Sequence, residues 1–215
     1  MYSQLPDVIE KNIVIPQGPM MFYQYLPIKL PCPDSFSPLG NIRVPQALVE
    51  FAEIIGSCID DFRAKFGQSE YNHSYIYITA KRMYQAGNCS YNRHGWHCDG
   101  FMTNDINYIW CDSSPTIFNN GKFNLTQDDA ISIKEMQQQA DSKFNKSFPV
   151  NTILRLNQYV VHKVSDVQIS GIRTFVKISF SRDFYDLIGN SINYELGYKH
   201  PNRKRNIERN VPQKI

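Results

Sequence analysis

The sequence predicts a mostly β fold with flanking helices, in the α+β class. Aromatic residues make up 13% of the 215-residue chain, a bias that suits the half-buried faces of strands more than helices. Runs of β-branched and aromatic residues recur from residue 74 onwards, and one clear amphipathic helical pattern precedes them. The chain is 42% apolar and can bury one ordinary core, so we expect a single domain over residues 1–215.

The first 44 residues are rich in proline around short apolar pieces, such as residues 12–15 and 20–23. Proline cannot donate a hydrogen bond to a neighbouring strand, so it is confined to edge strands and loops. We therefore expect extended edge strands and loops in this region.

A helical pattern follows over residues 45–66. Pro45 suits a first helical turn and Gly67 suits the position after the last. Apolar residues recur between them at steps of three and four, namely Leu48, Phe51, Ala52, Ile55, Ile59 and Phe62. This periodicity predicts an amphipathic helix that packs against a sheet. With the strands before it, this helix forms an N-terminal region over residues 1–67.

The middle of the chain predicts two strands and one inserted helix. Residues 74–84 and 106–111 have the composition of strands, and residues 112–115 that of a turn. Thr126, with Asp129 three residues later, predicts a helix cap for residues 127–142. The apolar face of that helix is thin, so we expect an exposed insert.

Three further strands are predicted over residues 152–156, 159–164 and 173–180. Side chains alternate between the two faces of a strand. In the last strand this alternation separates two sets, Arg173, Phe175, Lys177 and Ser179 from Thr174, Val176, Ile178 and Phe180. The second set is apolar and should meet the helix over residues 45–66, so Arg173 should point to the opposite side. The core of the domain is expected at about residues 74–184.

The net charge of +3 is too small to indicate a nucleic-acid-binding protein by itself. A basic cluster lies within a C-terminal tail over residues 199–215, and consists of Lys199, His200, Arg203, Lys204 and Arg205. The tail has two interpretations, a solvated terminus or an arm that contacts phosphate groups.

Five cysteines are an odd number without C-x-x-C pairs, which indicates reduced thiols rather than a disulfide framework or a zinc site. The first residues lack the features of a signal peptide, and no apolar run approaches ~18 residues. We therefore expect a cytoplasmic protein that does not associate with membranes.

Four residues carry the chemistry that the sequence predicts. His97 and Asp99 flank a single residue, so in an extended segment both side chains lie on the same side. His162 reaches them if its strand folds back alongside, and two imidazoles with one carboxylate form the facial triad of non-haem Fe(II) oxygenases. Arg173 follows His162 after ten residues, in the next strand, where its guanidinium can grip a dicarboxylate bidentately.

Together, His97-Cys98-Asp99, His162 and the H-x10-R spacing to Arg173 resemble the signature of the 2-oxoglutarate/Fe(II)-dependent oxygenase superfamily. The resemblance covers about residues 74–184 and implies a double-stranded β-helix, or jelly roll, backed by the N-terminal helix. Many members have a strand that ends in a tyrosine before a glycine-containing turn, as Tyr84 does here. By this resemblance Tyr84 and Arg82 also contact the 2-oxoglutarate. Residue 175 is phenylalanine where some branches have serine or threonine, which leaves the second partner of the cosubstrate carboxylate open.

The resemblance implies an iron dioxygenase that hydroxylates a C–H bond with O2 while 2-oxoglutarate is decarboxylated to succinate. The iron would do this chemistry and the protein would orient and shield the reactants. Residues 88–96 and 101–105 flank the site and are the expected substrate rim, where Trp96 and Phe101 either stack on a substrate or pack together. Cys98 should point away from the metal, and we interpret His94 as a loop or entrance residue.

Three substrate classes stay open at this point, namely nucleobases or nucleic acids, small metabolites such as free amino acids, and protein side chains. A competing hypothesis is a non-catalytic jelly-roll module that binds metal or a partner.

Overall fold

The computed structural model describes residues 2–32, 42–86, 89–90, 95–165, 170–198, 203–204 and 213–214. Six antiparallel strands form a main sheet in the order β1-β8-β5-β10-β3-β2. Their bounds are β1 Asp7–Lys11, β2 Met21–Lys29, β3 Tyr75–Gln85, β5 Ile106–Cys111, β8 Thr152–Leu156 and β10 Gly171–Ser181.

The remaining described strands form two smaller antiparallel sheets. One has the order β7-β6-β9 and the other pairs β11 with β4. Their bounds are β6 Ile117–Asn119, β7 Asn145–Ser147, β9 His162–Lys163, β4 Cys89–Ser90 and β11 Gln213–Lys214. The helical elements are η1 Gln46–Phe51, α1 Ala52–His73, α2 Asp129–Gln139, η2 Ser142–Phe144 and η3 Tyr194–Leu196. The predicted class, mostly β with flanking helices, is confirmed.

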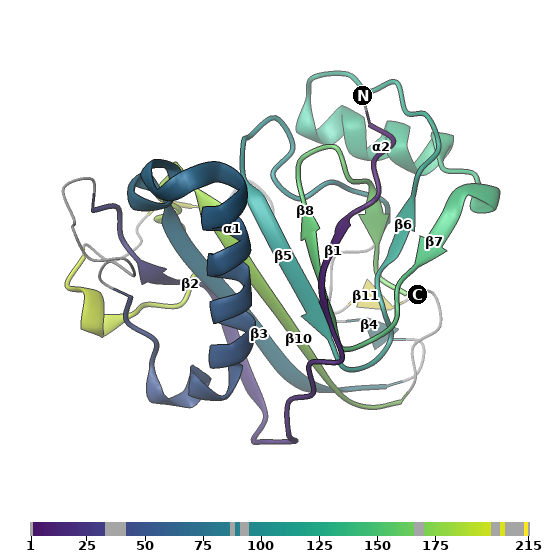
Figure 1. Ribbon diagram of the computed structural model, residues 1–215. Coiled ribbons are helices and arrows are strands. Elements are labelled where there is room, and N and C mark those ends of the chain that lie inside the picture. Colours follow the sequence, from purple (N-terminus) through teal and green to yellow (C-terminus); the bar gives the residue numbers. More distant parts are fainter. Residues whose placement is uncertain are drawn as a thin grey trace.

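Helix α1 covers one face of the main sheet, and the small sheet β7-β6-β9 lies with α2 beyond the β8 side (Figure 1). Strand β10 pairs along its length with β3 and over Phe175–Phe180 with β5. Its Val176, Ile178 and Phe180 join the apolar core under α1, and Phe180 stacks on Phe62 with ring centroids 4.0 Å apart. The predicted division of this strand into a helix face and an opposite face is confirmed.

The predicted helix over residues 45–66 is present and longer than expected. It begins as the 3-10 turn η1 after Pro45, and Gly67 interrupts it with a φ of 89° before it continues to His73. The buried Lys29 of β2 fixes its far end, because the ammonium donates to the carbonyl oxygens of Tyr71 and Ser74 at 2.9 Å. A cation near the C-terminal carbonyls of a helix is favourable for the helix dipole.

The N-terminal strands lie where the prolines predict them. β1 and β2 form the two edges of the main sheet. Residues 12–15 are not part of a strand. Ile13 is nevertheless buried, and its carbonyl oxygen accepts a hydrogen bond from Nε1 of the buried Trp110 at 3.0 Å.

The inserted helix α2 is shorter than predicted, and its cap was wrongly assigned. Asp128, not Thr126, accepts hydrogen bonds at the N-terminus, from the backbone N–H groups of Ala130 and Ile131. Thr126 bonds to the side chain of Glu135 instead. The insert is also less exposed than expected, since Met136 is buried against a small core that includes Trp96, Cys98, Phe123 and Val161.

The strand predicted over residues 159–164 is reduced to β9. A turn explains the difference, because Asn157 accepts hydrogen bonds from the backbone N–H groups of Tyr159 and Val160. Most of the C-terminal tail lies outside the described residues. Within its described part, Arg203 is exposed and bonds to Asp186.

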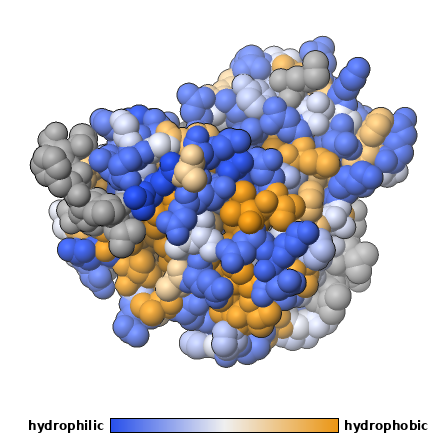
Figure 2. All heavy atoms as spheres, viewed as in Figure 1, coloured by the Kyte–Doolittle hydropathy of each residue, from blue (hydrophilic) through white to orange (hydrophobic). Residues whose placement is uncertain are grey.

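Hydrophilic side chains cover most of the side that carries α1, and the apolar ones that reach this surface form separate patches (Figure 2). No helix in the described part of the chain is both long and apolar enough to cross a membrane.

Candidate metal centre

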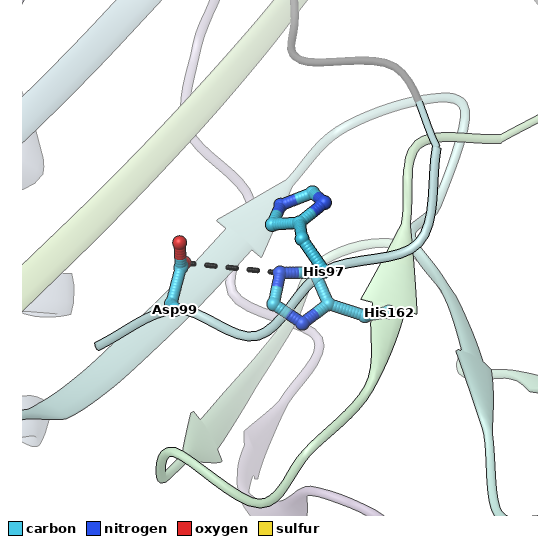
Figure 3. A group of neighbouring side chains, drawn as sticks. All are labelled: His97, Asp99 and His162. Atoms are coloured by element: carbon cyan, nitrogen blue, oxygen red, sulfur yellow. Dashed lines mark ion pairs between the residues drawn. The ribbon is translucent and has the colours of Figure 1, made fainter. Parts of the chain in front are cut away.

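Side chains from two segments that are distant in the sequence meet beside the main sheet. His97 and His162 form an antiparallel bridge, in which each backbone N–H donates to the other residue's carbonyl oxygen at 2.9 Å. Asp99 lies two residues further on, and the potential ligand atoms of all three lie within 4.8 Å of one another (Figure 3). Nε2 of His162 is 3.8 Å from Oδ2 of Asp99. The segment that contains His162 therefore folds back beside His97, as the proposed metal site requires.

Both imidazoles are oriented by their own backbone. Nδ1 of His97 is 3.0 Å from the carbonyl oxygen of Gly95, and Nδ1 of His162 is 3.0 Å from that of Val160. A carbonyl oxygen only accepts, so each ring carries its proton on Nδ1 when it is neutral. Nε2 then presents a lone pair, and a hydrogen bond from the other ring nitrogen is the usual support of a metal-bound histidine.

Asp99 lies in a strongly charged environment. Nζ of Lys177 donates to its Oδ2 at 3.2 Å and to the Tyr25 hydroxyl at 2.9 Å. Burial alone would raise the pKa of Asp99, but Lys177 and the two imidazoles outweigh it and hold this pKa well below its usual range. Asp99 is therefore a carboxylate at neutral pH, which is the form that binds metal.

A cavity of about 110 Å³ adjoins the three side chains. Its lining includes His97, Asp99, His162 and four cationic side chains, Lys81, Lys163, Arg173 and Lys177. The buried Arg173 donates from Nε to the carbonyl oxygen of Ser113 at 2.8 Å and from Nη2 to that of Ser114 at 3.2 Å. Its guanidinium carbon lies 5.2 Å from the centre of the Phe175 ring. The structure thus brings Arg173 to the same cavity as the candidate ligands.

Arg82 does not reach this cavity. Its guanidinium is buried on the helix face and forms two hydrogen bonds to the Glu50 carboxylate, at 2.9 and 2.6 Å. Its Nε donates to Thr174, the neighbour of Arg173 that faces the helix. The structure therefore does not bring Arg82 together with the candidate ligands, because Arg82 and Arg173 point to opposite faces of the sheet.

Tyr84 lies two residues after Arg82, so both side chains are on the same face of β3. Tyr84 is near the end of this strand and is 55% exposed. It is not part of the cavity lining, so the structure does not bring Tyr84 together with the candidate ligands either. The residues of opposite parity, Thr79 and Lys81, line the cavity instead. The sequence predicts this division of the strand, because its apolar residues Ile76, Ile78 and Ala80 place the even-numbered positions on the core face.

A second cavity of about 210 Å³ shares two lining residues, Asp99 and Tyr25, with the first. Part of the predicted substrate rim lines it, namely Phe101, Thr103 and Asp105. The Asp105 carboxylate accepts a hydrogen bond from the Tyr185 hydroxyl, and burial raises the pKa of both groups. This cavity is large enough for part of a small polar molecule.

Other rim predictions have different outcomes. Trp96 is buried in the small core, with the Lys163 ammonium 4.9 Å from its ring, so it packs rather than lines the rim. Cys98 points away from the site, as strand parity predicts, and its thiol contacts the Met136 sulfur at 3.9 Å. His94 and most of residues 88–96 lie outside the described residues.

The side chains of Cys32, Cys58, Cys98 and Cys111 are free thiols. The predicted reduced state is confirmed for these four. Burial raises the pKa of Cys58 and Cys98, which makes both thiols less reactive.

The chain matches no protein-family model and no curated protein. The case for a function therefore depends on the residues of the two cavities and on the groups that orient them.

Proposed function

We propose that this protein is a 2-oxoglutarate- and Fe(II)-dependent dioxygenase that hydroxylates a C–H bond. One observation carries the proposal: two histidines and one carboxylate converge at the wall of a cavity that also holds a buried arginine. The two histidines and Asp99 would bind the iron, and Arg173 would bind the distal carboxylate of the cosubstrate. The double-stranded β-helix expected from the resemblance belongs to the same proposal.

The donor set fits a divalent iron ion. Two imidazole nitrogens and one carboxylate oxygen occupy three positions of an octahedral ion, which leaves three for other ligands. The hydrogen bonds from Nδ1 to the carbonyl oxygens of Gly95 and Val160 give both rings the tautomer that a metal requires. His97 and His162 are also held together by their backbone bridge, so the ligand geometry does not depend on a mobile loop.

The basic cavity fits a dicarboxylate. Four cationic side chains line it, Lys81, Lys163, Arg173 and Lys177, and Asp99 is the one carboxylate among its described lining residues. The carbonyl oxygens of Ser113 and Ser114 hold the Arg173 side chain in place, and a fixed guanidinium binds a carboxylate with little further loss of entropy. When bound, iron and 2-oxoglutarate would supply the oxidation of the substrate, with succinate and CO2 as coproducts.

The second cavity is the proposed position of the substrate. It meets the basic cavity at Asp99 and Tyr25, so a molecule bound there lies next to the metal ligands. Asp105 and Asp129 contribute carboxylates to its lining. These charges favour a small polar molecule or a protein side chain over the phosphate groups of a nucleic acid.

The competing function is a non-catalytic module, and one contact favours it. Lys177 already pairs with Asp99 at 3.2 Å, so a cation occupies the side of the carboxylate that a metal also needs. In that case the three side chains would form a neutralised polar cluster, and the cavity would bind an anion without chemistry.

Anaerobic reconstitution with Fe(II) tests the proposal. Addition of 2-oxoglutarate should produce a weak visible charge-transfer band in the wild-type protein and no band in Arg173→Ala. Failure of the wild type to show a band, at saturating iron and cosubstrate, would reject the enzyme and leave the binding module.

A succinate-release screen then identifies the substrate class. Pools of amino acids, nucleotides, oligonucleotides and peptides should be compared, with Asp99→Ala as the blank. Stimulation by oligonucleotides that falls steeply with added salt would instead assign a nucleic-acid substrate.

A further inference from the structure

The second cavity has the opposite charge to the basic cavity. Its charged lining residues are three aspartates, Asp99, Asp105 and Asp129, and its described lining includes no lysine, arginine or histidine. Asp105 is buried, whereas Asp129 is exposed at the first position of α2. Lys177 contacts Asp99 and Tyr25, but of the two cavities it lines only the basic one. A positively charged group is therefore favoured in the second cavity.

Asp105 is a buried carboxylate whose hydrogen-bond partners are neutral. The residue is 6% exposed, and its carboxylate accepts from the hydroxyl groups of Tyr185 and Ser181. Burial is the largest influence on the pKa of Asp105 and raises it, the two hydroxyl groups lower it, and the charges of Asp183 and Lys177 contribute less. Buried carboxylates are normally paired with a cation, because an unneutralised charge is costly to remove from water. A cationic ligand in the cavity would supply the missing charge.

Three aromatic rings line the same cavity, those of Tyr25, Phe101 and Tyr185. The rings of Tyr25 and Tyr185 pack edge to face with centroids 5.6 Å apart, and Phe101 stacks on Tyr2. The faces of aromatic rings attract ammonium and guanidinium groups. The Lys177 ammonium already lies 4.7 Å from the centre of the Tyr25 ring. Aromatic walls beside a buried carboxylate thus suit a cation that is attached to a short carbon chain.

A tight turn joins Asp99 to Asp105 and fixes their separation. The backbone N–H of Thr103 donates to the carbonyl oxygen of Gly100 at 2.9 Å, and the Thr103 hydroxyl oxygen accepts from the Asp105 N–H at 3.2 Å. Gly100 has a φ of 67°, and a Cβ atom there would lie 2.7 Å from the Thr103 hydroxyl oxygen, so the turn requires glycine. Asp105 therefore has a defined position relative to the candidate metal ligand Asp99.

We propose that the substrate carries a positively charged nitrogen, in an ammonium or guanidinium group, which Asp105 binds among the aromatic rings of the second cavity. This inference rests on the proposed function. The carbon chain of the same molecule would extend toward Asp99, so the fixed turn would select which C–H bond lies beside the metal. Basic amino acids and the basic side chains of a protein share this chemistry.

Pairs of molecules that differ at the charged group test the inference. L-Citrulline has a neutral urea group in place of the guanidinium of L-arginine, and L-norleucine has a hydrogen atom in place of the ammonium group of the L-lysine side chain. The Nα-acetyl methylamides of these four amino acids represent residues within a protein. Isothermal titration calorimetry with the metal-free protein measures each affinity. In at least one pair, the cationic member should bind at least about tenfold more tightly than its neutral partner.

Substitution of Asp105 tests its role in this preference. Asp105→Asn keeps the shape of the side chain and removes its charge, so it should weaken binding of the cationic member at least about tenfold and of the neutral member less than about threefold. Asp60→Asn makes the same change in α1 at a side chain that is 79% exposed, and it should change neither affinity. Asp105→Ser is measured in parallel, so that a folding defect of the asparagine variant does not decide the result.

The outcomes separate this inference from the proposed function. The charge-transfer band of the Fe(II) protein with 2-oxoglutarate decides the function, and the titrations of the metal-free protein decide the charge of the ligand. A wild type that binds both members of every pair equally, or binds none of them, contradicts the inference even if the band is present. A cation preference that persists in both Asp105 variants contradicts the role of Asp105. A cation preference that both variants lose, in a protein without the band, supports the cation site and rejects the dioxygenase.

Discussion

The two faces of the β3–β10 pair carry charge in opposite ways. On the helix face, the buried Arg82 guanidinium is paired with the Glu50 carboxylate. On the cavity face, Lys81, Arg173 and Lys177 line a space to which Asp99 contributes the only carboxylate among the lining residues that are described. Both faces belong to the same strands. The ion pair of the first face stabilises the fold, and under the proposed function the excess positive charge of the second face would serve a bound anion.

The largest expected effect concerns the helix face. Glu50→Ala leaves the Arg82 guanidinium buried without its carboxylate and should lower the free energy of unfolding by about 3–5 kcal/mol. Urea denaturation measures this, with the exposed Glu53→Ala of the same helix as the control. If Glu50→Ala unfolds like the control, the ion pair does not stabilise the fold and the contrast between the faces fails.

The next effect concerns the cavity face. His97→Ala removes one of three proposed ligands and should weaken metal binding at least about 100-fold, since loss of even a supporting group typically costs 10–100-fold. The free energy of unfolding of the metal-free protein should change by less than about 1 kcal/mol, because this side chain is only partly buried. Titration with Co(II), followed by absorbance, measures the affinity. An unchanged affinity would remove His97 from the site.

A smaller effect is expected from pH. The pKa of Lys81 is about 7 in the folded protein and near 10.5 when unfolded. Between these values the unfolded chain binds more protons, so the stability of the metal-free protein should rise with pH. The rise attributable to Lys81 should reach about 2 kcal/mol between pH 7 and 9, and there should be none below pH 6.

Other buried groups titrate in the same range, so the wild type must be compared with Lys81→Met. Burial lowers the pKa of Lys29 to about 8, which contributes a rise of the same sign. The difference between the two proteins isolates Lys81, and parallel curves for both would show that its ammonium is solvated.

The smallest effect is expected at Tyr84. Its exposed side chain lies on the parity of the helix face, so Tyr84→Ala should change the 2-oxoglutarate affinity by less than about twofold. Titration of the charge-transfer band measures this. A large loss of affinity would restore the cosubstrate contact that the tyrosine-glycine resemblance implied.

Local patterns predicted much of the fold. The three- and four-residue spacing before Gly67 located the helix, and the alternation after Arg173 assigned both faces of β10 correctly. The same rule was available for β3, where the apolar even positions place Arg82 on the helix face. The resemblance implies that Arg82 contacts the cosubstrate, whereas the alternation correctly predicts the helix face for it.

Long-range contacts could not be derived from local patterns. The pairing of Lys177 with Asp99 and Tyr25 depends on a bend in β2, where Tyr25 has a φ of 46° and the strand register shifts. The burial of α2 depends on Met136, which packs against Trp96 and Cys98 from a distant segment. Neither contact produces a periodic pattern in the sequence from which it could be predicted.

The backbone bridge between His97 and His162 affects local unfolding of the protein. These residues close the long stretch of chain that contains α2, and two backbone hydrogen bonds join its ends beside the small core around Met136. An ion bound to both imidazoles would act as a crosslink, and its binding free energy would add to the cost of opening the stretch. Amide hydrogen exchange in α2 would then slow as the metal concentration rises, so the inserted helix would report how much iron is available to the protein.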